Sequence, residues 1–227
     1  MACGRPRHSG ADLASQPTIS RLENAPDLRA LIRLSRELVD LWCRSHATAP
    51  KSIVLDIDDT ADTVRGHQQL SLFNAHYDER CFLPIHIYDA ATGHCVLTIL
   101  RPGKTPNGEE VRGHLRRLIR RIRRHWPATA ITIRGDGHHG RKEVMDWCEQ
   151  HDVTYIFGFA PNKVLAELVS PKLDECCVRR ALAQAEKVRD FTWTRYAAKS
   201  WARARRVVAR IEVTRKGADV RYHRHQH

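Results

Sequence analysis

The sequence predicts an α/β fold built around a mixed β-sheet. Apolar runs at residues 52–60, 81–88 and 95–100 follow one another directly, which predicts three successive antiparallel strands. Helical patterns then alternate with two more strand-like runs, at 130–134 and 153–159, and this order predicts a parallel, right-handed crossover. Further strand-like runs at 191–196 and 205–214 predict a small β-rich appendage.

The first 50 residues predict a disordered start and a helical segment. Residues 1–12 are polar and lack periodicity, as in disordered chains. A hydroxyl residue precedes the short helical pattern that ends near Asn24, as in a capped helix. Residues 28–45 predict an amphipathic helix, whose apolar side carries Leu31, Leu34, Leu38, Leu41 and Trp42.

Residues 51–190 predict the main domain. The loop 89–93 has a length typical of hairpins. The next helix is expected to begin at Asn107, a good capping residue, with Glu109 and Glu110 in its first turn, where the helix dipole favours negative charge. Apolar residues recur at helical spacing along it, which predicts one face packed on the sheet: Val111, Leu115, Leu118, Ile119, Ile122 and Trp126.

The remaining elements complete this domain and add the appendage. Helices are expected at 141–151, 163–169 and 174–189. The appendage covers residues 191–221 and includes a turn at Lys216 and Gly217. Residues 222–227 lack an apolar pattern, so a disordered tail is expected.

Bulk composition narrows the class of protein. A chain of 227 residues that is 42% hydrophobic can bury one sizeable core. No apolar run approaches the roughly 20 residues that cross a bilayer, and the start lacks a secretion signal, so a cytoplasmic protein without a membrane partner is expected. Seven cysteines without a Cys-x-x-Cys pair indicate reduced, mostly buried thiols rather than a zinc site.

Charge points to a polyanionic partner. The formal net charge is +12, from 38 Lys and Arg against 26 acids. Arginines crowd the polar faces of the helix after Asn107, where like charges repel and a phosphate backbone would neutralise them. A solvated basic face is the alternative. The candidate DNA-binding residues are Arg112, Arg116, Arg117, Arg120, Arg121 and Arg124, together with Lys104.

Acidic residues follow two of the expected strands. Asp56 and Asp58 are two apart on the first strand and share one face, whereas Asp59 points away. Asp136 follows the strand at 130–134. Paired like charges on a buried face need compensation, and a divalent cation supplies it. The alternative is that these aspartates only cap turns.

The segment Leu55-Asp-Ile-Asp-Asp-Thr60 resembles the nucleophile loop of haloacid-dehalogenase-like phosphatases. That resemblance implies Asp56 as the nucleophile, Asp58 as the proton donor and Asp136 on magnesium. Two features weigh against it. The core sheet of that family is parallel throughout, and its second acid in the later loop is absent after Gly135-Asp-Gly-His-His-Gly140.

A longer resemblance is to bacterial insertion-sequence transposases of the DDE type, DDE domain group 1. It is carried by Ser15–Asn24, Val54–Thr60 with Gly66-His-Gln68, Leu100–Lys104, Ile133–Asp136 and Tyr155–Asn162. The resemblance implies a ribonuclease-H-like core in which Asp58 and Asp136 coordinate two Mg²⁺ ions, with Asp56 as the alternative to Asp58. It also implies cleavage and strand transfer of double-stranded DNA at transposon ends.

The sequence departs from that family at the third acid. Members carry a glutamate on a helix after the β-rich insertion, and no such pattern occurs before His227. We therefore expect a truncated transposase that is inactive alone. A DNA-binding remnant that pairs with itself or with an intact transposase is the alternative.

Overall fold

The computed structural model describes residues 14–66 and 68–225, so the predicted disorder at residues 1–12 lies outside the described residues. The chain divides after Glu37 into two compact units, which are described separately. The first unit contains α1 (Gln16–Asn24) and most of α2 (Leu28–Arg44), as the sequence predicts. Leu31, Leu34, Leu38 and Leu41 are nevertheless exposed, and of the expected apolar face only Trp42 is buried.

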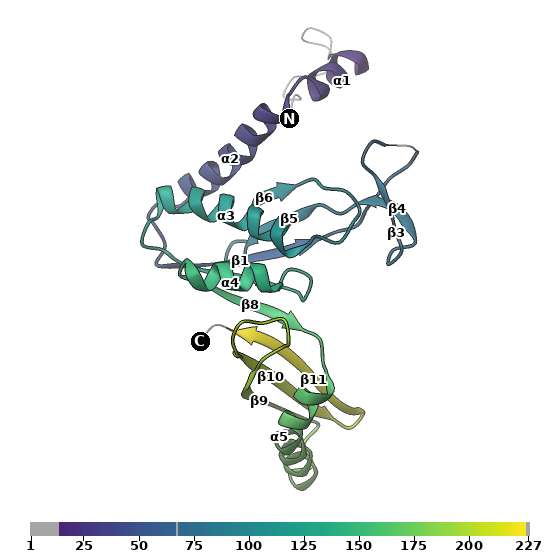
Figure 1. The fold of residues 1–227 in the computed structure, drawn as a ribbon, viewed down its shortest axis with the longest axis vertical. Helices are drawn as coiled ribbons and strands as arrows, with labels where there is room; N and C mark the ends of the chain where they lie inside the picture. The colour runs from purple at the N-terminus through teal and green to yellow at the C-terminus, as the bar shows by residue number, and fades with distance from the viewer. Residues whose placement is uncertain (1–13, 67, 226–227) are drawn as a thin grey trace, which may run out of the picture. The chain divides into compact units, whose positions relative to one another are not determined.

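The second unit is built on an eight-stranded mixed sheet with the order β6-β5-β1-β7-β8-β11-β10-β9 (Figure 1). β1 (Ser52–Asp59) pairs antiparallel with β5 (Ile85–Asp89), which pairs antiparallel with β6 (Cys95–Ile99). On its other side β1 runs parallel to β7 (Ala130–Gly135), and β7 runs parallel to β8 (Val153–Phe159). The predicted ribonuclease-H-like mixed sheet is therefore confirmed.

Two helices cover one face of these strands. In β1, Ile53, Leu55 and Ile57 are buried, because alternate residues of a strand face the same side. They join one core with the apolar faces of α3 (Gly108–His125) and α4 (Lys142–Gln150). α3 begins as predicted, since the side chain of Asn107 accepts a hydrogen bond from the backbone N–H of Glu110.

The strand predicted at 81–88 is in fact two strands in two sheets. β4 (Glu79–Phe82) pairs with β2 (Asp62–Thr63) and β3 (Leu72–Asn74) in a small separate sheet. Pro84 separates β4 from β5 and cannot donate to a strand ladder, which explains the break. Among the described residues, no helix is both long enough and apolar enough to cross a membrane.

The C-terminal part differs most from the prediction. α5 (Lys163–Leu182) is one helix that runs through Pro171, where two helices were expected. β9 (Lys187–Tyr196), β10 (Arg205–Thr214) and β11 (Gly217–His225) form a meander, and α5 covers one of its faces. Because β11 also pairs with β8, the β-rich part continues the main sheet instead of standing apart.

The expected tail at 222–227 is therefore wrong for its first four residues. Tyr222 and Arg224 are buried, and they alternate along β11 with His223 and His225 on the opposite face. Residues 226–227 lie outside the described part of the chain. The alternation was missed because one side of the strand is polar throughout and Arg224 is a charged residue in the interior.

Candidate active site

The acids at the ends of β1 and β7 have different surroundings. Asp56 pairs across the sheet with Arg134, whose Nε and Nη2 donate to its two carboxylate oxygens at 2.7 and 2.6 Å. The hydrogen bond and the charge of Asp56 raise the pKa of Arg134. Both oxygens of Asp56 are thus engaged by one guanidinium.

Asp58 lies on the same face of β1 as Asp56, as the sequence predicts, and its side chain is exposed. Its Oδ1 accepts a hydrogen bond from the backbone N–H of Asp59 at 2.9 Å. One carboxylate oxygen of Asp58 is therefore engaged by the backbone of the next residue.

Asp59 is the residue that sequence reasoning set aside. It is half-buried, and its Oδ2 is a buried oxygen without a hydrogen-bond partner in the described structure. Burial raises the pKa of Asp59, the charges of His139 and His138 lower it, and those of Asp136 and Asp58 raise it further. The signal was present in the sequence: Asp59 continues the row of Ile53, Leu55 and Ile57, so it is the acid on the core face of β1.

Asp136 is held by the loop that follows β7. Its Oδ1 accepts hydrogen bonds from the backbone N–H of His138 at 2.8 Å and lies 3.0 Å from Nδ1 of His139. Burial raises the pKa of Asp136, but the His139 hydrogen bond and the charges of both histidines prevail and lower it to about 2. His139 is fully buried, and its Nε2 has no partner within the described structure.

The pKa of Tyr77, in the turn between β3 and β4, is shifted by the charges of Asp58, Asp59 and Asp136. Burial raises the pKa of its hydroxyl, and the charges of Asp59, Asp58 and Asp136 raise it further. These carboxylates therefore act on one another and on a common hydroxyl at the edge of the sheet. Asp56 does not belong to this group, because its charge is compensated by Arg134.

The backbone around Asp136 is packed tightly. A Cβ added to Gly135 would lie 2.8 Å from Cγ2 of Ile57 and 3.0 Å from its carbonyl oxygen, so β7 can approach β1 closely only because residue 135 is glycine. The loop 136–140 therefore begins at a fixed position beside the end of β1.

Arg224 of β11 contacts the far end of the loop 136–140, at Gly140. It is 5% exposed and donates to the carbonyl oxygen of Gly140, and at 2.7 Å to that of Gly158. Its guanidinium also lies over the ring of Phe159, 4.7 Å from the centroid. No carboxylate among the described residues pairs with it, and burial lowers its pKa to about 10. Arg224 thus joins the Asp136 loop to β8.

The family resemblance implies Mg²⁺, which prefers oxygen ligands such as carboxylates. Among the described residues, no three His, Cys, Asp or Glu side chains converge as a ready metal cage. Mg²⁺ often uses only one or two protein carboxylates and keeps several waters. The unpartnered buried oxygen of Asp59, coupled to the ionised Asp136, fits such a hydrated cation.

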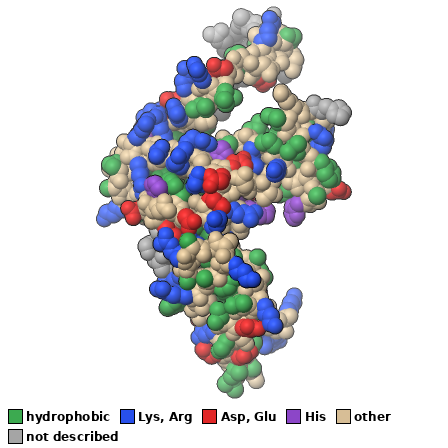
Figure 2. Space-filling view, in the orientation of Figure 1, with side chains coloured by type: hydrophobic (Ala, Val, Ile, Leu, Met, Phe, Trp, Pro, Cys, Tyr) green, Lys and Arg blue, Asp and Glu red, His purple; other side chains and the backbone are tan. Residues whose placement is uncertain are grey.

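The predicted DNA-binding arginines of α3 fall into two groups. Arg121 makes a bidentate ion pair with the buried Asp40 of α2, which lowers the pKa of Asp40 to about 2. Arg112 pairs with Glu109, and a nitrogen of Arg117 lies 3.2 Å from Nδ1 of His114. Arg116, Arg120, Arg124 and Lys104 are exposed, and basic side chains gather over α3 in Figure 2.

The strand order defines a ribonuclease-H-like fold, with Asp58 and Asp59 at the end of β1 and Asp136 directly after β7. The family model described as "Transposase DDE domain group 1" matches residues 1–223, and the chain belongs to this family. A comparison with curated proteins found no match.

Solved transposase structures show weak similarity. The "Mos1 transposase paired-end complex with left transposon end" is 14% identical, with a TM-score of 0.33 over 67% of this chain and 46% of that one. The "Drosophila P element transposase strand transfer complex" is 13% identical, with a TM-score of 0.27 over 62% and 34%. The chain thus spans less than half the length of these transposases.

Proposed function

We propose that this chain carries part of the site for metal-dependent phosphoryl transfer on DNA, the chemistry of strand cleavage and strand transfer at transposon ends. Membership of the transposase family supports the reaction class. The observation that carries the proposal for this chain is the buried, unpartnered Oδ2 of Asp59, which is coupled electrostatically to Asp136.

We assign Asp59 and Asp136 as the residues that would hold Mg²⁺, with Asp58 as the competing first acid. When bound, Mg²⁺ would activate a water or a 3′ hydroxyl and stabilise the charge that develops on the phosphate. His139 keeps Asp136 ionised and oriented through its Nδ1. Arg134 compensates Asp56, which argues against Asp56 as ligand or nucleophile and hence against the phosphatase alternative.

The proposed partner is double-stranded DNA. Arg116, Arg120, Arg124 and Lys104 are exposed and can reach phosphates, which fix position without reading sequence. Arg121 is better explained as a structural residue, because Asp40 holds its guanidinium. We further propose that the isolated chain binds DNA but does not complete strand transfer, since no third ligating side chain joins the two acids among the described residues.

The test uses a labelled duplex with and without Mg²⁺. The proposal expects a gel shift that Arg120→Ala weakens, and it expects Asp136→Asn to bind the duplex normally. The surface variant Asp174→Asn on α5 is the matched control. A chain that does not bind duplex DNA in 50 mM salt would refute the partner, and strand transfer by the isolated chain would refute the proposed inactivity.

A further inference from the structure

The meander β9-β10-β11 has one covered face and one open face. α5 packs on the side that carries Val207, Ala209 and Ile211 of β10. On the opposite side, Phe191 and Trp193 of β9 are 58% and 57% exposed, although large aromatic side chains are costly to leave in water. An exposed aromatic pair side by side on an open sheet face indicates a binding surface.

Strand register arranges this open face in five rows, and the aromatic residues lie in two neighbouring ones. Trp193 lies opposite Val208, which lies opposite His223. The rows on either side of Trp193 hold basic residues, and Asp219 in the adjoining row pairs with Arg210 at 3.4 Å and with Arg221 at 3.0 Å. One of these rows is Arg195, Arg206 and His225, and the other is Phe191, Arg210 and Arg221.

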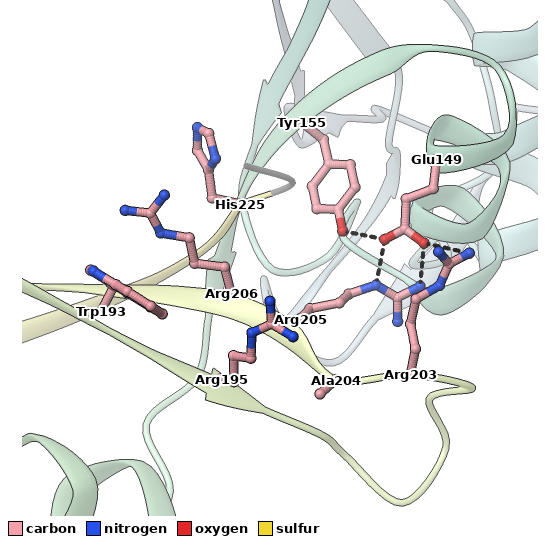
Figure 3. Close-up of a pocket in the computed structure, with 9 residues that line it drawn as sticks. All are labelled: Glu149, Tyr155, Trp193, Arg195, Arg203, Ala204, Arg205, Arg206 and His225. Atoms are coloured by element: carbon pink, nitrogen blue, oxygen red, sulfur yellow. Dashed lines mark hydrogen bonds and ion pairs between the residues drawn. The ribbon is translucent and has the colours of Figure 1, made fainter.

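A cavity of about 450 Å³ adjoins the row of Arg195, Arg206 and His225 (Figure 3). Arg195, Arg206 and His225 line it together with Trp193, Arg203 and Arg205. Glu149 in its wall engages Arg205 at 2.7 Å and Arg203 at 3.1 Å, and four arginines against this single lining carboxylate leave the cavity positive. Arg205 is 4% exposed, and its buried Nη1 has no partner in the described structure.

Trp193 and the arginines form one continuous surface. The guanidinium of Arg206 lies over the indole of Trp193, 5.0 Å from the ring centroid. Arg195 is exposed and makes no ion pair with any described residue. A ligand for this surface needs flat aromatic groups for the rings and regularly spaced anions for the arginines.

We propose that this open face binds unpaired nucleotides of a DNA strand, with bases stacked on Trp193 and Phe191 and phosphates at Arg195 and Arg206. Duplex DNA fits less well, because its bases are already stacked on each other and only single strands can offer their flat faces. The inference rests on the proposed function for the identity of the nucleic acid, but it does not require the carboxylate site.

Trp193 gives the experiment an internal probe. The chain has five tryptophans, and Trp42, Trp126 and Trp147 are buried while Trp201 is half-buried. A 12-nucleotide oligo-dT added in EDTA should therefore quench mainly Trp193. Trp193→Phe should lose the quenching while keeping measurable binding by anisotropy.

Affinity separates the contributions. Trp193→Ala should weaken oligo-dT binding about tenfold, the middle of the range for one base–aromatic stack. Arg195→Ala should weaken binding and reduce its salt dependence, whereas Arg215→Ala, in the exposed turn between β10 and β11, should do neither. Melting curves should match the wild type, because the substituted side chains are exposed.

The outcomes are distinguishable from a failure of the proposed function. Normal duplex binding with oligo-dT affinity unchanged by Trp193→Ala would overturn this inference alone. Loss of duplex binding with oligo-dT binding retained would overturn the duplex partner alone. Tighter binding of oligo-U than of oligo-dT would overturn DNA as the ligand of this face.

Discussion

Replacement of Arg224 by methionine tests whether β11 fixes the loop of Asp136. The change removes both hydrogen bonds and leaves the carbonyl oxygens of Gly140 and Gly158 without that donor. Each buried, unsatisfied carbonyl costs about 1–3 kcal/mol. Removing a buried guanidinium that has no carboxylate partner returns part of this cost. We therefore expect the free energy of unfolding to fall by about 2–4 kcal/mol in urea titrations.

The same variant should affect the metal site, because the freed loop carries Asp136. Substitution of a residue that orients a metal ligand without touching the metal typically weakens metal affinity about 10- to 100-fold. We expect the affinity for Mn²⁺, measured by calorimetry, to weaken by about that factor. Arg224→Lys keeps one charged donor, so it should lose less stability and less Mn²⁺ affinity than Arg224→Met. Arg221→Met, exposed on the same strand, is the control. If Arg224→Met unfolds and binds Mn²⁺ like the control, β11 does not position Asp136.

Three further predictions concern other parts of the chain. Burial raises the pKa of Asp59, so its ionised form opposes folding above that pKa; Asp59→Asn should raise the melting temperature at pH 7 without metal, and a lower melting temperature would contradict this. Asp40→Asn should cost about 3 kcal/mol, because it removes the buried carboxylate that pairs with both Arg121 and His125. Since the Asp40 pKa is lowered to about 2, its stabilising contribution should fade as pH falls from about 4 to 2, which acid titration of both proteins can detect. Arg120→Ala should reduce the slope of log affinity for duplex DNA against log salt by about 1, whereas Arg121→Ala should leave the slope unchanged and lower stability.

Local patterns predicted much of the fold. The alternation of β1, the cap at Asn107 and the apolar stripe of α3 were sufficient, because each is encoded by neighbouring residues. The meander was harder. β11 depends on pairing with β8, more than 50 residues earlier, and its buried Arg224 looks like a surface residue in sequence.

For the candidate site, too, local patterns were sufficient only in part. The sequence marked both acidic segments, but the choice among Asp56, Asp58 and Asp59 required their partners. Arg134 meets Asp56 only because β1 and β7 pair in register, and His139, whose charge lowers the pKa of Asp59, lies in the loop after β7. Alternation within one strand could show which acids share a face, but not which of them lies beside Asp136.

Mn²⁺ binding to a double-mutant cycle of Asp59→Asn and Asp136→Asn tests the central claim most directly. If both carboxylates hold one cation, each single variant should weaken binding strongly, and the double variant should lose much less than the sum of the two losses. Asp58→Asn should have the smaller effect. Additive losses, or normal binding by Asp59→Asn together with loss in Asp58→Asn, would contradict the assignment.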